Sequence, residues 1–191
     1  MNSLLNLDTY FFRLINQGGT PFWDPIFLLA SNKWAWIPLY AFLVFLIFKK
    51  KKQSGFLALL FITLIVVISD QGSVHLFKNV FERLRPCHFL DNVRLVTEGC
   101  GGQFGFISSH ASNVFGLAVF IGSILDKKTF ALLFLWAAIV SFSRVYVGVH
   151  YPLDILFGMI YGTTVSLILV KIYNTYEKTL SNFFKSTFKI G

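Results

Sequence analysis

Long apolar runs separated by short polar breaks make up most of this chain of 191 residues. A helix that crosses the hydrocarbon core of a bilayer requires about 20 predominantly apolar residues. The runs that reach or approach this length predict five spans, at residues 34–48, 55–85, 109–125, 129–147 and 152–173. The breaks between the last three spans are short, so these helices should be antiparallel neighbours in a compact bundle.

The N-terminal segment, residues 1–31, has a more polar pattern. Residues 4–15 alternate apolar and polar positions at helical spacing, with Asp8 among the interruptions, and this predicts a helix that lies at the membrane interface. The apolar stretch at 22–30 is too short to span. A sixth span formed from residues 7–31 is the alternative, and it would change only the side on which the N-terminus lies.

The composition favours a membrane protein over a soluble one. Hydrophobic residues make up 55% of the chain, charged residues 14%, and the mean hydropathy is +0.65. Soluble domains carry about 25% charged residues. We therefore expect an all-α, polytopic transmembrane helix bundle, organised as a single domain over residues 1–191.

Clusters of basic residues between or after the apolar runs account for much of the net charge of +8. They lie at residues 49–52, at residues 127–128 and towards the C-terminus at Lys171, Lys178, Lys185 and Lys189, the last three in the predicted cytoplasmic tail, 174–191. Positive residues near spans are retained in the cytoplasm, so the loop 86–108 and the turn 148–151 should lie on the outer side. This placement is explained by membrane topology, and we expect no nucleic-acid partner.

Both cysteines, Cys87 and Cys100, fall in the predicted outer loop. On an oxidising face a disulfide between them is expected, and closing this loop would contribute about 3 kcal/mol to stability. Two unpaired thiols are the alternative.

Three cations stand near the predicted outer ends of helices, where a charge beside the bilayer calls for a functional explanation. Lys78 and Arg85 are seven residues apart on the second predicted helix, so their side chains should share one face and reach a single anion. Arg144 stands near the outer end of the fourth predicted helix. Together they predict a site for an anionic group.

Candidate catalytic side chains accompany these cations. His150 precedes the fifth predicted helix, and Asp154 follows in its first turn, where a carboxylate can hold the imidazole in one tautomer. Ser108 and Ser109 occupy the N-cap region of the third predicted helix, and His110 comes next. Hydroxyls and free backbone N–H groups at a helix start form a cradle for phosphate.

Three motifs in this order carry a resemblance to a known family. They are K-x6-R-P from Lys78 to Pro86, S-S-H from Ser108 to His110, and S-R-x5-H-x3-D from Ser143 to Asp154. The chain resembles the type 2 phosphatidic-acid phosphatase superfamily, and its spans resemble the membrane-bound bacterial lipid phosphatases of that group. The family's middle motif commonly reads P-S-G-H, whereas here Ile107 replaces the proline and Ser109 the glycine. The amide of Ser109 can still donate, so we expect activity to survive.

The resemblance implies a division of roles among these residues. Lys78, Arg85 and Arg144 would neutralise the phosphoryl oxygens, assisted by Ser108 and by the backbone N–H groups of Ser109 and the residue after it. A cationic cluster of this kind makes a metal redundant, and the sequence shows no Asp, Glu and His set with metal-ligand spacing. We therefore expect neither a metal nor another cofactor.

The catalytic steps are implied in the same way. His150 would attack phosphorus and form a phosphohistidine, with Asp154 orienting its imidazole. His110 would protonate the leaving group and later activate water.

The predicted function is that of a lipid phosphate phosphatase in the bacterial cytoplasmic (inner) membrane, with its site open to the outer, periplasmic side. The substrate would be a phosphomonoester or pyrophosphate of a membrane lipid, such as phosphatidate, phosphatidylglycerophosphate, undecaprenyl pyrophosphate or lipid A. The rival hypothesis is a membrane protein that binds or transports an anion or a lipid phosphate without hydrolysis. Anion binding needs the cations alone, whereas the pairing of His150 with Asp154 and the presence of His110 favour hydrolysis.

Four polar residues near the motifs have no assigned role. His75 and His88 are interpreted as packing or surface residues. Arg83 would point about 140° away from Lys78 on an ideal helix, so it is assigned to the surface or headgroup zone. Asp70 lies near mid-membrane on the second predicted helix and either packs in the bundle or lines the path of the lipid.

Overall fold

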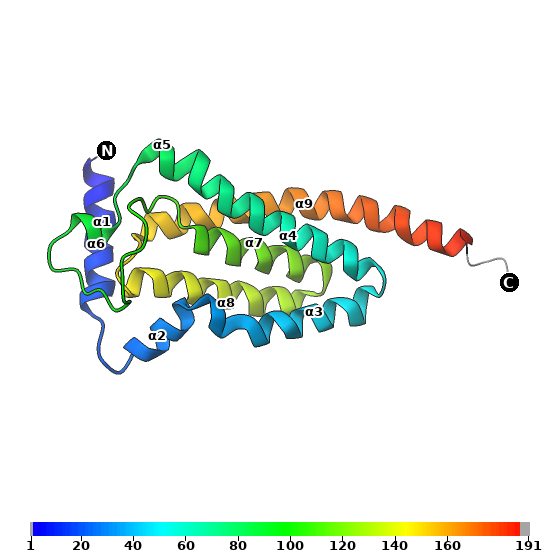
Figure 1. The fold of residues 1–191 in the computed structure, drawn as a ribbon, viewed down its shortest axis with the longest axis horizontal. Helices are drawn as coiled ribbons and strands as arrows, with labels where there is room; N and C mark the ends of the chain where they lie inside the picture. The colour runs from blue at the N-terminus through cyan, green and yellow to red at the C-terminus, as the bar shows by residue number, and fades with distance from the viewer. Residues whose placement is uncertain (1, 188–191) are drawn as a thin grey trace.

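The fold is an all-helical bundle, described by a computed structural model over residues 2–187 (Figure 1). Its elements are α1 (Asn2–Gln17), α2 (Asp24–Ser31), the 3-10 turn η1 (Lys33–Trp36), α3 (Ile37–Lys51), α4 (Ser54–Gly72), the π-helical segment η2 (Ser73–Lys78), α5 (Asn79–Phe81), α6 (Pro86–Phe89), α7 (Ser109–Ile124), α8 (Lys127–Tyr146) and α9 (Pro152–Thr187). The predicted all-α class is confirmed.

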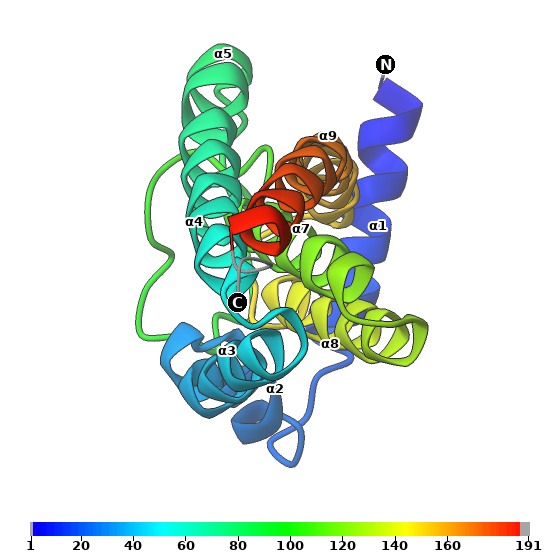
Figure 2. The same ribbon diagram turned by 90° about the vertical axis from the view of Figure 1, so that its right-hand side faces the viewer.

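Helix α7 lies at the centre of the bundle, with α4, α8 and α9 packed around it (Figure 2). Most of its side chains are buried. It approaches α9 closely because Gly162 has no side chain: a Cβ there would lie 2.0 Å from the backbone oxygen of Ser112. Small residues at such crossings let helix backbones meet in a membrane.

In the part of the chain that the structure describes, three helices are long and apolar enough to cross a membrane, namely Ser54–Phe81, Lys127–Tyr146 and Pro152–Leu180. A fourth span would come from Asp24–Ser31 together with Lys33–Lys51, two helices bent by 73° at the break between them. Helix α7 is shorter, at 16 residues, but its neighbours shield it from lipid. The bundle therefore contains the five predicted helices, and the protein is an integral membrane protein.

Helix α1 crosses one end of the bundle at a steep angle to the other helices (Figure 1). Asp8, Phe12 and Asn16, which are spaced four residues apart, are almost fully buried against the bundle. The opposite face exposes large apolar side chains, among them Leu7 and Leu14. Because its exposed face carries large apolar side chains, α1 has the surface expected of a helix that lies in the membrane interface.

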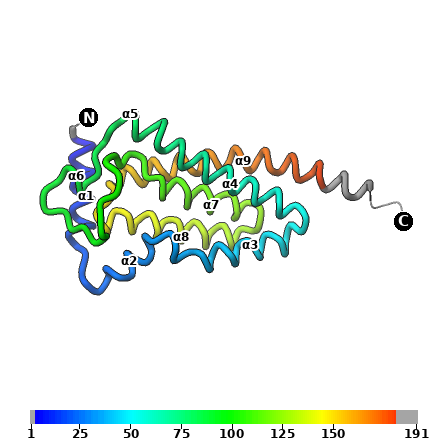
Figure 3. Tube along the Cα trace, in the orientation of Figure 1, coloured from blue at the N-terminus to red at the C-terminus, as the bar shows by residue number. Residues whose placement is uncertain are grey.

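The two ends of the bundle differ in the elements they carry (Figure 3). The basic turn between α3 and α4 and the turn between α7 and α8 lie at one end. Helix α1, helix α6 and the long loop before α7 lie at the other. Helix α9 extends past the predicted span as far as Thr187, so most of the predicted tail is helical, while Lys189 lies outside the described residues.

The prediction that the second helix continues to Arg85 is wrong. The helical segment ends at Phe81, because Glu82 adopts a left-handed conformation with φ 46°. The chain then runs extended: Leu84 forms an antiparallel bridge with Phe104, and the Arg85 N–H donates to the Gln103 oxygen at 3.1 Å. Arg85 is therefore placed by a loop, and it does not share a helix face with Lys78.

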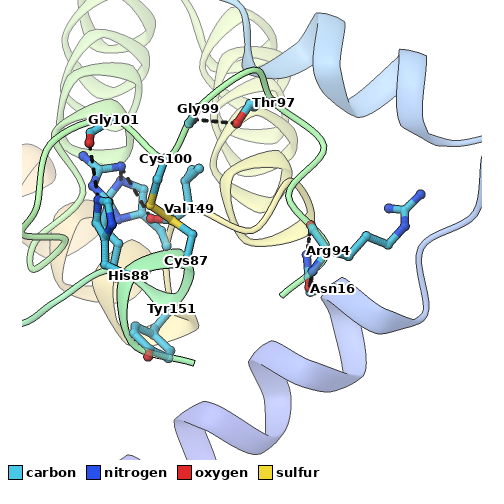
Figure 4. Close-up of a disulfide and its surroundings, with 12 residues drawn as sticks. Asn16, Cys87, His88, Arg94, Thr97, Gly99, Cys100, Gly101, Val149 and Tyr151 are labelled. Carbon is cyan, nitrogen blue, oxygen red and sulfur yellow. Dashed lines mark hydrogen bonds between the residues drawn. A yellow bond between two sulfur atoms is a disulfide. The ribbon is translucent and has the colours of Figure 1, made fainter. Parts of the chain in front are cut away.

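The loop of residues 86–108, predicted to lie on the outer side, is fastened at two points (Figure 4). A disulfide joins Cys87 to Cys100, directly after the Arg85–Pro86 pair. Asn16 of α1 accepts a hydrogen bond from the Arg94 N–H at 2.9 Å and donates to the Arg94 carbonyl at 2.8 Å and to the Tyr146 carbonyl at 2.9 Å. These contacts tie α1, the loop and α8 together around the predicted site.

Candidate active site

The start of α7 forms one wall of the site. Ser108 is the N-cap, and its hydroxyl accepts from the Ala111 N–H at 3.4 Å. The Ser109 hydroxyl accepts from Lys78 Nζ at 2.7 Å and is also hydrogen-bonded to Ser73. The Ser108 N–H donates to the Asp154 carbonyl at 3.0 Å, which joins α7 to the first turn of α9. All three predicted motifs thus meet at this helix start.

His150 lies between α8 and α9 and is 1% exposed. Its Nδ1 is 3.2 Å from Asp154 Oδ2, which also accepts from the Tyr151 N–H at 3.0 Å. Asp154 can bend back to His150 because Pro152 starts the helix and places residue 154 in its first turn. A proton held on Nδ1 by this carboxylate leaves the Nε2 lone pair free to attack.

Arg85 faces the free nitrogen of that imidazole. Its Nη1 lies 3.4 Å from His150 Nε2 and 3.5 Å from the Val149 carbonyl oxygen. Gly105 makes room for this approach, because a Cβ there would lie 3.0 Å from Asp154 Oδ2 and 3.2 Å from Arg85 Cγ. Since no carboxylate among the described residues 2–187 pairs with Arg85, its charge remains available to an anion beside Nε2.

Arg144 approaches from α8, and its Nη1 donates to the hydroxyl of Ser31 at the end of α2. Ser31 was not among the predicted site residues. The bend between α2 and α3 brings it to the site.

His110 completes the group. It lies within electrostatic reach of Arg144, His150, Arg85 and Lys78. The structure therefore gathers all the predicted catalytic and phosphate-binding residues at one end of the bundle, the end away from the basic turns.

Burial and charge together set the state of His150. Burial, followed by the positive charges of Arg85, Arg144 and Lys78, lowers the pKa of His150 well below its ordinary value. Burial also lowers the pKa of Arg85, although a guanidinium stays protonated in proteins. The site thus presents a neutral imidazole beside fixed positive charges, which suits nucleophilic attack on a phosphate group.

The assignment of Arg83 to the surface is wrong. Its Nη1 donates to Asp154 Oδ1 at 3.0 Å and its Nη2 to Asp8 Oδ2 at 2.6 Å. The ideal-helix projection failed because the helix ends before this residue. In an extended segment, side chains two residues apart point the same way, so Arg83 and Arg85 both face the His150–Asp154 pair.

A cavity of about 610 Å³ opens beside the start of α7, between α3, α4 and α7. Its lining is mainly apolar and includes Leu43, Ile47, Val66 and Ile121. Polar residues line it as well, namely Lys33, Asp70, Gln71, Ser109, His110 and Asn113. Asp70 therefore lines a cavity that reaches the candidate site.

The remaining histidines lie at the surface. His75 and His88 are exposed, and His88 Nε2 lies 3.4 Å from the Gly101 carbonyl oxygen. Within residues 2–187, no three His, Cys, Asp or Glu side chains are grouped as metal ligands.

Comparison with known proteins places this geometry in a family. The chain matches the model of the PAP2 superfamily over residues 55–178. It is 37% identical to a lipid A 4'-phosphatase of Porphyromonas gingivalis over 91% of this chain and 75% of that protein. It is 33% identical to a lipid A 4'-phosphatase of Bacteroides thetaiotaomicron over 83% of this chain and 73% of that protein. An undecaprenyl-diphosphatase of Sulfolobus acidocaldarius is 31% identical over 86% of this chain and 77% of that protein.

Two solved structures have a similar fold. LpxE of Aquifex aeolicus superposes with a TM-score of 0.66 and 28% identity, covering 86% of this chain and 95% of that one. A transmembrane PAP2-type phosphatidylglycerolphosphate phosphatase of Bacillus subtilis gives a TM-score of 0.71 at 21% identity, covering 92% and 88%, and so supports the fold alone. The family match spans most of the bundle and the resemblance of the three motifs agrees with it, so this protein belongs to the PAP2 superfamily.

Proposed function

We propose that this protein removes a phosphate group from a lipid A-type glycolipid, with His150 as the nucleophile. The predicted lipid phosphohydrolase activity is confirmed at the level of class by the relatives, which are lipid A 4'-phosphatases and an undecaprenyl-diphosphatase. The two lipid A 4'-phosphatases are more similar to this chain than the undecaprenyl-diphosphatase is, and this difference supports lipid A as the first substrate to test.

The main support for the proposal is that the His150 imidazole lies between the carboxylate of Asp154 and the guanidinium of Arg85. The carboxylate holds Nδ1 of the imidazole, and the guanidinium lies 3.4 Å from Nε2 on the other side. A phosphoryl group bound by Arg85 would lie directly in front of the attacking nitrogen. Placement of the reacting atoms before the reaction is a large part of phosphoryl-transfer catalysis.

Binding of the phosphate uses the remaining cations and the start of α7. Lys78, Arg85 and Arg144 neutralise the phosphoryl oxygens, and the backbone N–H groups of Ser109 and His110 add hydrogen bonds at a positive helix end. Ser108, as the N-cap, holds the first turn of α7 in place. The charge that develops on the oxygens in the transition state is thus met by fixed donors.

The chemical steps follow from these positions. His150 Nε2 forms a bond to phosphorus while the bond to the lipid oxygen breaks, and His110 donates a proton to that oxygen. A water molecule then gives a proton to His110 and attacks the phosphohistidine, which releases inorganic phosphate and restores His150. No step requires a metal.

The cavity beside α7 supports a lipid as the substrate. It joins the polar end at His110 to an apolar space between α3, α4 and α7, where an acyl or prenyl chain can lie while the phosphate reaches His150. Delivery from the membrane between these helices would keep the chains out of water.

The arrangement of charge supports the proposed orientation. The site lies at the end of the bundle opposite the basic turns 49–52 and 127–128 (Figure 1). With those turns in the cytoplasm, the site would face the outer side of a bacterial inner membrane, and the disulfide would lie on an oxidising face.

The test is phosphate release by the purified protein in detergent with EDTA present, measured on lipid A, undecaprenyl diphosphate and phosphatidylglycerophosphate. We expect turnover that resists EDTA, is fastest on lipid A and is abolished in His150→Ala. Acid-quenched reactions should contain phosphohistidine in the wild type. Binding of these lipids without phosphate release would instead support the binding or transport hypothesis, and activity that survives His150→Ala would exclude the mechanism.

A further inference from the structure

The buried carboxylate of Asp8 is unusual for a helix at a membrane interface. It is 3% exposed although α1 carries exposed apolar side chains on its other face. Its Oδ1 accepts from the Leu153 N–H at 2.9 Å, and its Oδ2 accepts from Arg83 Nη2 at 2.6 Å. Burying a charge is costly unless it is paired, so this position needs an explanation beyond membrane binding.

Arg83 connects that carboxylate to the catalytic one. Its other terminal nitrogen, Nη1, donates to Asp154 Oδ1 at 3.0 Å. Its guanidinium lies 4.0 Å above the ring of Tyr151, and Phe12 of α1 packs against the same ring with centroids 5.4 Å apart. One planar cation is thus held by two buried carboxylates and an aromatic face, which fixes it in a single orientation.

We propose that Asp8 and Arg83 are positioning residues for His150, so that the N-terminal helix forms part of the catalytic apparatus. The chain of contacts runs Asp8–Arg83–Asp154–His150. Arg83 holds Oδ1 of Asp154 and thereby aims Oδ2 at the imidazole. Asp8 holds Arg83 in turn and offsets its positive charge beside Asp154. This inference rests on the proposed role of His150 as nucleophile.

The merely structural alternative is that the Asp8–Arg83 pair fastens α1 to the bundle. Both roles predict some loss of stability when the pair is broken, so stability cannot separate them. The pH dependence of catalysis can, because the two residues carry opposite charges near the same imidazole. The other titratable and charged groups that face the His150–Asp154 pair are Arg85 and Tyr151 from the loops, Lys78 of η2, His110 of α7 and Arg144 of α8, and all are unchanged in the variants below.

The experiment compares Asp8→Asn and Arg83→Gln, measured as kcat, KM and the acid limb of kcat/KM on the preferred lipid phosphate. We expect kcat to fall roughly 10- to 100-fold in each, with KM nearly unchanged, because a small misplacement of the nucleophile is costly. Removing the carboxylate should shift the acid limb to lower pH, since a positive environment disfavours the imidazolium. Removing the guanidinium should shift it to higher pH.

Arg83→Lys provides the conservative comparison. A single ammonium keeps the charge but cannot bridge two carboxylates as the planar guanidinium does. We expect this variant to restore the acid limb to its wild-type position while kcat stays low.

The matched control is Asp24→Asn, which breaks the ion pair between Asp24 of α2 and Arg94 of the outer loop. That pair also fastens a peripheral element to the outer end, but it does not touch Asp154. We expect a lower unfolding temperature and an unmoved acid limb.

Two results would overturn the inference: wild-type kcat in both variants, or acid limbs that coincide with that of the wild type while only the unfolding temperature falls. The activity of His150→Ala distinguishes a failure of the positioning role from a failure of the proposed function. If that variant is inactive while Asp8→Asn and Arg83→Gln are normal, His150 is the nucleophile and the positioning role alone is excluded.

Discussion

The two ends of the bundle both carry basic residues, yet they use them differently. At the end with the turn 49–52 the lysines stand at the surface, and Lys51 makes a partly exposed ion pair with Glu177 of α9 at 2.9 Å. At the opposite end Arg85 and Arg144 are half-buried, and neither forms an ion pair with a carboxylate within residues 2–187. Solvated lysines set topology, whereas buried cations without counter-ions are positioned for a bound anion.

The clearest comparison is between two arginines at the end that carries the candidate site. Arg83 and Arg85 are two residues apart on one extended segment and point the same way. Arg83 is held by Asp8 and Asp154, whereas the polar partners of the Arg85 side chain within residues 2–187 are the Nε2 of His150 and the carbonyl oxygen of Val149. Contact with carboxylates thus distinguishes Arg83, for which we propose an orienting role, from Arg85, which we propose binds the phosphate.

The largest effect is expected from Arg85→Ala. Removing a fixed donor to the charge that develops on phosphate should lower kcat about 10²- to 10³-fold. Lys50→Ala removes an exposed cation in the basic turn 49–52, at the end of the bundle away from the candidate site. It should leave kcat within the error of the wild type. Phosphate release from purified protein measures both, and equal losses in the two variants would show that overall charge, rather than placement, governs activity.

The next largest effect is expected when the pH is lowered, measured as the decline of kcat/KM. In the proposed mechanism His150 attacks as the neutral imidazole, and burial together with nearby cations lowers its pKa. As pH falls, the imidazole therefore stays neutral through the ordinary histidine value of about 6.5. Activity should persist through that pH and decline only below it, by about tenfold for each further unit.

An acid limb at or above the ordinary histidine value would contradict this expectation. His110→Gln supplies the control, because its residual activity should keep the same acid limb if His150 is the group that titrates. The limb would disappear if His110 were responsible.

The sequence predicted which residues form the candidate site better than it predicted the backbone structure that places them there. The periodicity of apolar residues located the five bundle helices, and the three motifs supplied the candidate catalytic and phosphate-binding residues, but they did not supply Ser31 or the role of Arg83. The end of the second helix was misplaced because the left-handed turn at Glu82 carries no signal such as glycine or proline. Because of this one error, Arg85 was predicted to lie on a helix and Arg83 was predicted to lie at the surface.

The contributions of α1 and α2 could not be found from local pattern either. Asp8 was read as one polar interruption in an interfacial helix, and its burial depends on a residue 75 positions later in the chain. Ser31 reaches Arg144 only because of the bend after α2. Such contacts are set by how the helices cross, which apolar periodicity does not determine.

The smallest effect is expected at Ser109, where this chain departs from the family's common glycine. The hydroxyl accepts a hydrogen bond from Lys78 at 2.7 Å, whereas the proposed contact with phosphate uses the backbone N–H. Ser109→Gly removes only the hydroxyl contact, and a hydrogen bond of this kind contributes about 0.5–1.5 kcal/mol. We therefore expect kcat/KM to fall about two- to tenfold, mostly through KM, because Lys78 is then less well placed before phosphate binds.

Ser109→Pro separates the amide from the hydroxyl. Proline is tolerated at the first position of a helix, so α7 should still form, but the N–H that faces the phosphate is lost. The loss of kcat should then exceed that of Ser109→Gly and approach the roughly 10²-fold cost of removing one fixed donor. If Ser109→Gly instead lowers kcat as much as Ser109→Pro does, the hydroxyl itself contacts the phosphate. The serine that replaces the family's common glycine would then contribute directly to catalysis.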